Sequence, residues 1–365
     1  MRQRATAAVA ITLSLLCLLQ AFGPQAQWDL RIWLAMGHAF REGRTPYVNL
    51  GDGLFFVYPP IAAPLLAPLS LLSLRAATAV WLLLKLIAFS GLIAIWRRFV
   101  EIRGSALEVL YFLFAFGSAL SIDLISGNPG MFEQLGIWLG LLALSRGRIA
   151  WFCIAIVVTA QLKIAPALML LALLAIPEKP RWGAFGLSAG GFLAMLGLQR
   201  VIAPEWFAEF VRRSAGVDER GPSNPALVAL IRDIVAQPPL AAAATVVAVA
   251  AILVLSGRAL RRSGADPASR VMLVAVAYAL IAPRFKDYSY VLLLPVGLHL
   301  LRRARVAVPL AAAIAFPVPR GARALAATGR YLETYYPLAC ALLAFKLLLD
   351  ELSGPGPSPD VSGPP

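Results

Sequence analysis

The sequence predicts an all-α protein, a polytopic bundle of helices that crosses a lipid bilayer about twelve times. Of the 365 residues, 60% are hydrophobic and only 14% are charged, and the mean hydropathy is +0.76. A soluble chain this apolar would have too few polar residues to cover its surface. The hydrophobic residues also form long blocks, with basic residues gathered in the short segments between them. Together these observations favour lipid as the solvent around most of the chain.

The hydrophobic blocks are close to the roughly 20 residues that a helix needs to cross a membrane. Backbone groups in lipid must be bonded within their own segment, so blocks of this length favour helices over an open sheet. No run of short alternating segments typical of a β-barrel occurs. The clearest blocks are Ala5–Phe22, Ala76–Trp96, Ala106–Ile122, Ala150–Ile176, Gly183–Leu198, Pro239–Leu255 and Tyr331–Leu349.

The net charge of +14 comes from basic clusters that separate the apolar blocks. Such clusters are typical of cytoplasmic loops, so the charge predicts topology and no nucleic-acid partner. We therefore expect a multi-pass protein of the cell (plasma or inner) membrane, with interior loops that are short and basic and longer exterior loops. The clusters are Arg97, Arg98 and Arg103; Arg146 and Arg148; Lys179 and Arg181; Arg258, Arg261 and Arg262; and Arg302, Arg303 and Arg305.

The first apolar block follows Arg2 and Arg4, as in a secretory signal peptide, and Ala26 suits the end of a cleavage motif. Because many further spans follow, we expect an uncleaved first helix with its N-terminus in the cytoplasm. Residues 1–352 then form a single transmembrane domain. Residues 353–365, rich in Gly, Pro and Ser, are expected to be a disordered tail.

The first exterior loop covers residues 23–57. Within Trp28–Phe40, apolar residues and Asp29 recur at helical spacing, which predicts an amphipathic juxtamembrane helix. Pro59–Leu74 is short and contains internal prolines. It is either a half-span or a second juxtamembrane helix, and the basic cluster after Trp96 favours the latter.

Asp123–Gln134 is expected to be an exterior loop. Ala150–Ile176 is too long for one span, and we expect two short spans that meet at the outer face around Lys163. Val201–Pro238 is expected to be a second long exterior loop with a surface helix, and Pro283–Tyr290 a charged exterior turn. Further spans return to Arg302 and follow it.

Ionisable residues near membrane depth are costly and are therefore functional candidates. Asp29 is a candidate general base, and helix capping is an equally good explanation of it. Lys163 is a candidate phosphate clamp, or a lysine that extends to the membrane interface. Arg284, Lys286 and Asp287, with Tyr288, suit a phosphate head, although an ordinary turn explains them as well.

A weaker candidate group combines Asp123 with Gly127–Gly130, Glu133 and Gln134, because glycines allow a ligand close to the backbone. The three cysteines lie in apolar blocks, and the two histidines are far apart. We therefore expect no metal site and no cofactor, although nothing in the sequence excludes a divalent metal.

The order of several short motifs resembles glycosyltransferase family 87, polytopic enzymes of the GT-C superfamily that includes polyprenyl-phosphate-mannose-dependent mannosyltransferases. The resemblance runs from about Asp29 to Pro295. It is carried by Asp-Leu-Arg-Ile-Trp from Asp29, Gly43-Arg-Thr-Pro-Tyr47, Val57-Tyr-Pro-Pro60, Pro68, Trp81, Gly127-Asn128, Lys163-Ile-Ala-Pro166 and Pro283.

The resemblance implies that Asp29 matches the family's essential aspartate in the first exterior loop. Tyr58 matches its Tyr-Pro-Pro segment, and Lys163 its Lys-x-x-Pro. Asn128 matches a Gly-Gln-x-Asn motif that lacks its glutamine here. Many members have a histidine after the late aspartate, where this chain has Tyr288 after Asp287.

We therefore expect an inverting glycosyltransferase that moves a mannose-like sugar from a polyprenyl-phosphate donor to a lipid or glycan acceptor on the outer face. Asp29 is the expected base. The expected substrate-binding residues are Tyr58, Asn128, Lys163, Arg284, Lys286, Asp287 and Tyr288. Membrane lipids are the other expected partners. A transporter or flippase of an anionic lipid is the alternative, although such proteins often contain repeated halves and none is visible here.

Overall fold

The computed structural model describes residues 2–47, 49, 51, 56–175, 179–216, 224–261, 266–303, 314 and 327–353. Helices dominate these ranges, and no β-strand element occurs within them. The predicted all-α class is therefore confirmed. The expected tail lies outside the described residues from 354 onward, as do most of residues 304–326.

The first half of the chain contains α1 (Arg2–Gln20), α2 (Trp28–Arg41), α3 (Ala62–Leu66), the 3₁₀ helix η1 (Ala67–Leu71), α4 (Leu74–Trp96), α5 (Ala106–Ser126), α6 (Gly130–Ser145) and α7 (Ile149–Leu162). The second half contains η2 (Ala165–Leu174), α8 (Trp182–Ile202), α9 (Pro204–Gly216), α10 (Leu227–Ile234), α11 (Pro238–Leu260), α12 (Pro267–Ile281), η3 (Asp287–Leu293), α13 (Leu294–Arg303) and α15 (Ala327–Ser353).

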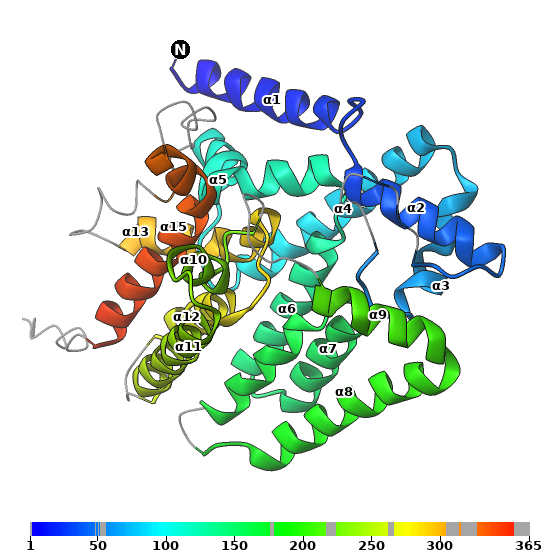
Figure 1. Cartoon of the computed structure of the whole chain (residues 1–365). Helices are drawn as coiled ribbons and strands as arrows, with labels where there is room; N and C mark the ends of the chain where they lie inside the picture. Colours follow the sequence, from blue (N-terminus) through cyan, green and yellow to red (C-terminus); the bar gives the residue numbers. More distant parts are fainter. Residues whose placement is uncertain are drawn as a thin grey trace, which may run out of the picture.

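Among the described residues, five helices are long and apolar enough to cross a membrane: α1, α4, α5, α8 and α11. Five shorter apolar segments accompany them: α3 with η1, α6, α7, η2 and α12. This supports a membrane protein of several spans, and the number of about twelve stays a prediction. Figure 1 shows α6, α7 and α8 alongside one another, with α11 and α12 forming a neighbouring group.

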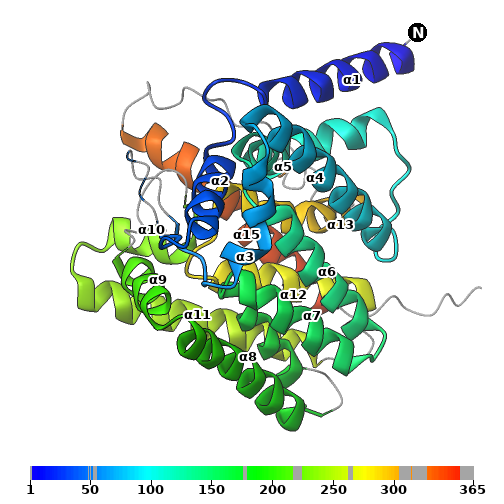
Figure 2. The ribbon, with the colours of Figure 1, turned by 90° about the vertical axis from the view of Figure 1, so that its right-hand side faces the viewer.

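Helices α2, α3 and α9 gather at one end of the α6–α8 group (Figures 1 and 2). Their aromatic side chains form a small core of their own. The rings of Trp33 and Tyr58 lie 4.4 Å apart between centroids, and those of Phe40 and Trp206 lie 5.8 Å apart. The amphipathic helix predicted within Trp28–Phe40 and the surface helix predicted within Val201–Pro238 are therefore present as α2 and α9.

Helices α6 and α7 pack closely because glycines of α6 face α7. A Cβ atom at Gly136 would lie 2.1 Å from Thr159 Oγ1, and one at Gly140 would lie 3.0 Å from Ile156 Cδ1. Small residues allow this approach between helices in lipid, where packing replaces the hydrophobic driving force. The close packing of α6 and α7 holds the start of α6, where Glu133 lies, beside the end of α7, which Lys163 follows.

The expected exterior loop Asp123–Gln134 was wrong. Helix α5 continues to Ser126 and α6 begins at Gly130, so only three residues connect them. Asp123 is fully buried and forms a 2.8 Å ion pair with Lys85 of α4, which is also fully buried. Asp123 is therefore a helical residue of α5, where the Lys85 ammonium compensates its buried charge.

The expected break in Ala150–Ile176 is confirmed. Helix α7 ends at Leu162, and Lys163 adopts an extended conformation before η2 begins. Residues Pro59–Leu74 likewise form only the short α3 and η1. This agrees with the juxtamembrane alternative and not with a half-span. The chain thus brings Tyr58 and Lys163 to the same end of the helices.

Candidate active site

The three-residue connection between α5 and α6 presents Asn128. Gly127 ends α5 with φ of 74°, and a Cβ atom there would lie 2.5 Å from Gln27 Oε1, so only glycine fits without a shift. The Asn128 backbone N–H donates to Ser126 Oγ, and Asn128 Oδ1 accepts a 2.9 Å hydrogen bond from the Gly130 N–H. These contacts fix the Asn128 amide, with its NH₂ group pointing away from the turn.

The NH₂ group of Asn128 is where three predicted site residues meet. Its Nδ2 lies 2.8 Å from Asp29 Oδ2, 2.9 Å from the Tyr288 hydroxyl and 3.1 Å from the Tyr58 hydroxyl. These residues come from α2, η3 and the segment before α3. The structure therefore joins four of the eight predicted site residues around one side chain.

Asp29 lies in the first turn of α2, whose start is attached to the end of α5. The Gln27 N–H donates to the Ile125 carbonyl at 2.7 Å, and Gln27 Nε2 donates to the Leu124 carbonyl at 3.0 Å. Gln27, with φ of 59°, precedes the helix and makes no side-chain cap. The Asp29 carboxylate instead bonds Asn128, so helix capping does not explain it.

Burial raises the pKa of Asp29 above its ordinary value. The hydrogen bond from Asn128 opposes this rise, as do the positive charges of Lys85, Lys286 and Arg284. The residue as a whole is half-buried. An acidic group with a raised pKa is suited to accept a proton from a bound hydroxyl.

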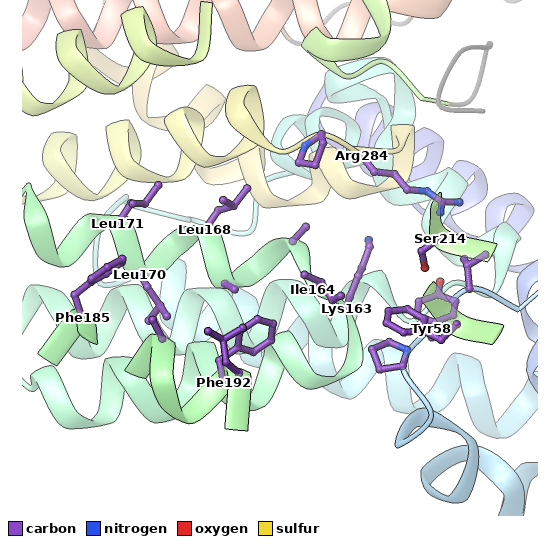
Figure 3. Close-up of a pocket in the computed structure, with 18 of the residues that line it drawn as sticks. Tyr58, Lys163, Ile164, Leu168, Leu170, Leu171, Phe185, Phe192, Ser214 and Arg284 are labelled. Carbon is purple, nitrogen blue, oxygen red and sulfur yellow. The ribbon is translucent and has the colours of Figure 1, made fainter. Parts of the chain in front are cut away.

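Tyr58, Lys163, Arg284 and Tyr288 line one cavity of about 560 Å³. The rest of its wall is almost entirely apolar and comes mainly from η2 and α8, and the exposed Ser214 of α9 also lines it (Figure 3). Neither Asp29 nor Asn128 lines this cavity. Both lie behind its wall, because Asn128 bonds Asp29 and donates to the hydroxyls of Tyr58 and Tyr288, which do line it. The cavity thus combines cations at one end with apolar walls at the other.

Lys163 is held by Glu133, a contact that the sequence analysis did not predict. Its Nζ lies 2.7 Å from Glu133 Oε2 and 5.8 Å from the centre of the Tyr288 ring. Glu133 Oε1 also accepts a 3.4 Å hydrogen bond from the Tyr278 hydroxyl. An ammonium group has three donors, so Lys163 can bond an anion while Glu133 holds it in place.

The late turn is fixed by Phe285, which is buried and whose N–H donates to Asn224 Oδ1 at 3.1 Å. Arg284 precedes it and extends into the cavity (Figure 3). Lys286 and Asp287 do not line the cavity. Asp287 Oδ1 accepts from the Tyr288 N–H at 2.8 Å, and Lys286 acts on Asp29 through its charge.

The buried charge of Lys85 behind the site, and its pairing with Asp123, were missed by the sequence-based prediction. Lys85 donates to both the backbone carbonyl and the carboxylate of Asp123, one turn before Asn128. The Asp123 carbonyl also accepts from Ser126 Oγ. A lysine inside the apolar block Ala76–Trp96 was the available signal, because such a residue needs a buried partner.

One group of described residues has the geometry of a metal site: Asp266, His299 and Glu351. It lies at the opposite end of α12 from Arg284, about 20 Å away along the helix. Arg303 already supplies a cation there, with Nη1 at 2.7 Å from Glu351 and 3.0 Å from Asp266. We therefore assign no metal to this cluster.

Comparisons with known proteins identify a family for the chain. The profile of glycosyltransferase family 87 matches residues 56–283. This range includes Tyr58, Asn128 and Lys163, whereas Asp29, Arg284, Lys286, Asp287 and Tyr288 lie outside it. No curated protein and no solved structure matches the chain. The profile covers more than half of the sequence and favours an enzyme over a transporter: this helical membrane protein belongs to glycosyltransferase family 87.

Proposed function

We propose that the protein transfers a mannose-like sugar from a polyprenyl-phosphate donor to a hydroxyl of a lipid or glycan acceptor on the outer face of the cell membrane. The observation that carries this proposal is the cavity itself. It places Lys163 and Arg284 beside an apolar wall, and Asn128 connects it to a carboxylate whose pKa is raised.

The cavity suits a donor with an anionic head and a hydrocarbon tail. Lys163 and Arg284 bind the phosphate at the polar end, and Leu168, Phe192 and their neighbours contact the chain. As the bond between the anomeric carbon and the phosphate oxygen breaks, charge accumulates on the lipid phosphate. Cations already in place at that position lower the barrier most.

Asp29 acts as the general base. Its carboxylate removes the proton of the acceptor hydroxyl while that oxygen attacks the anomeric carbon from the side opposite the phosphate. A single displacement of this kind inverts the anomeric configuration. The pKa of Tyr58 is raised by burial and by the charge of Asp29, so its hydroxyl stays protonated and can donate to a sugar oxygen.

The remaining predicted residues have supporting positions. Lys286 adds positive charge near Asp29, and Asp287 holds the turn that carries Tyr288. Tyr288 stands where many family members have histidine. Here it lies under Lys163 and bonds Asn128, which makes it a wall of the donor site.

The test is transfer of radiolabelled sugar from polyprenyl-phosphate mannose to a panel of lipid and glycan acceptors in isolated membranes. We expect the Asp29→Asn variant to lose at least a hundredfold in rate with unchanged expression, because a general base contributes about 10²–10⁴-fold. Glu42→Gln is the matched control, since Glu42 is an exposed carboxylate beyond the end of the same helix. Unchanged transfer by Asp29→Asn would sink the mechanism.

A further inference from the structure

Three cavities follow one another along η2, starting at the candidate active site. The outermost is the 560 Å³ cavity, the middle one has about 50 Å³, and the innermost has about 390 Å³. Leu168 and Leu171 line both the outer and the middle cavity. Ala172 and Ala175 line both the middle and the inner cavity. The 3₁₀ helix is therefore a common floor for all three.

Beyond Lys163 and Arg284, the walls of these cavities are mainly apolar until the innermost one. Helix α8 borders the outer cavity with Phe185 and Phe192, and α11 and α12 border the middle one. No charged side chain of the described residues lines the middle cavity. Arg181 and Arg270 appear only at the innermost cavity. The three cavities thus offer apolar surface between Lys163 and Arg284 at one end and Arg181 and Arg270 at the other.

Helix η2, along which the three cavities lie, is longer than half a bilayer is thick. A 3₁₀ helix rises about 2.0 Å per residue, so Ala165–Leu174 spans about 20 Å. One leaflet contributes only about 15 Å of a hydrocarbon core that is roughly 30 Å thick. Ala172 and Ala175 lie toward the inner end of η2, where they line both the middle and the innermost cavity. Because their side chains are small, we expect a larger residue at either position to fill this space.

We propose that the middle cavity and the inner half of η2 bind the distal part of the donor's hydrocarbon chain, so that the enzyme selects lipid phosphates by chain length. This inference rests on the proposed function. A short chain ends within the outer cavity and makes no contact with Ala172. A long chain reaches Ala172 and Ala175, and its additional buried surface strengthens donor binding.

Donors of two chain lengths test the inference. We expect wild-type protein to show at least a tenfold lower KM for long-chain than for short-chain polyprenyl-phosphate mannose. Ala172→Phe should remove this difference by raising the KM of the long-chain donor, and leave the short-chain donor unaffected. Ala194→Phe on an exposed part of α8 is the matched control, expected to change neither KM. Equal KM values in wild type, or equal effects of Ala172→Phe on both donors, overturn the inference.

A binding experiment separates this inference from the proposed function. A long-chain polyprenyl phosphate without sugar carries a photoreactive diazirine at the end of its chain, and crosslinked residues are mapped by mass spectrometry. We expect crosslinks at Ala172–Ala175 and at the facing positions Leu260 and Val274, whether or not sugar transfer is observed. Crosslinks confined to exposed faces of α1 and α8 overturn the inference, even if short-chain donors are used as substrates.

Discussion

Asn128 has two amide hydrogens and three acceptors within 3.1 Å, which makes it the residue on which the candidate site depends. Gly130 and Ser126 fix its orientation from behind. Loss of the Asn128 side chain would therefore separate Asp29 from both tyrosines. It would also leave the Asp29 carboxylate without its hydrogen bond, while burial still opposes ionisation.

We predict that Asn128→Ala moves the acid limb of the kcat/KM profile to higher pH. Asp29 must be ionised to act as a base, and its pKa is already raised by burial. The Asn128 hydrogen bond favours the ionised form, so removing it raises the pKa further. At the acid end of the profile, kcat/KM should fall by roughly tenfold, the worth of one hydrogen bond to a charged group. A uniform fall at every pH would contradict an effect on Asp29.

The buried Lys85–Asp123 pair contributes to the stability of the protein. Both side chains are fully buried, so Lys85→Met leaves an unpaired carboxylate and should destabilise the protein by about 3–5 kcal/mol. In the double variant Lys85→Met, Asp123→Leu most of this loss should be regained, because the uncompensated charge is gone. Thermal unfolding in detergent measures both. A double variant less stable than Lys85→Met would argue against the pair.

The sequence identified the polar residues of the site better than it identified their partners. Asp29, Tyr58, Lys163, Arg284 and Tyr288 were predicted from their places between apolar blocks and from the family resemblance. The Glu133–Lys163 and Lys85–Asp123 pairs join residues 30 and 38 positions apart on different helices. No local pattern encodes such contacts, since they depend on how α4, α5, α6 and α7 pack.

The α5–α6 connection decides the geometry of Asn128. Its glycine-rich sequence favoured a long exterior loop. The structure instead contains a tight connection, because Gly127 ends α5 in the left-handed conformation and Pro129 directly precedes α6. The break at Lys163 was predictable for the opposite reason, since a lysine and Pro166 interrupt an otherwise apolar block.

We predict that Gly127→Ala lowers transfer at least tenfold and destabilises the protein more than Gly147→Ala does. Both glycines have positive φ, 74° and 68°, so both variants bear the same backbone strain of about 1–2 kcal/mol. Only at Gly127 does the added Cβ also meet Gln27 and Leu30, at 2.5 and 2.8 Å. Equal losses of activity in the two variants would show that the contact between α2 and this connection is unimportant.

For the whole molecule, the arrangement of charge predicts which way the site faces. Basic residues lie away from the connection that carries Lys163: Arg146 at the end of α6, Arg148 at the start of α7 and Arg258 in the last turn of α11. Because basic loops stay in the cytoplasm, the cavity lined by Lys163 and Arg284 should open to the outside. A lipid-linked donor would then reach it from the outer leaflet.

A cysteine-labelling experiment checks this orientation. Cys17, Cys153 and Cys340 are first replaced, and single cysteines are introduced at Ser214, which lines the cavity, and at Arg146; both positions are exposed. In intact cells a membrane-impermeant maleimide should label Ser214→Cys, whereas Arg146→Cys should react only after permeabilisation. The opposite pattern would place the site in the cytoplasm. Acceptor hydroxyls would then have to be cytoplasmic, and the outer-face reaction proposed for Asp29 could not occur.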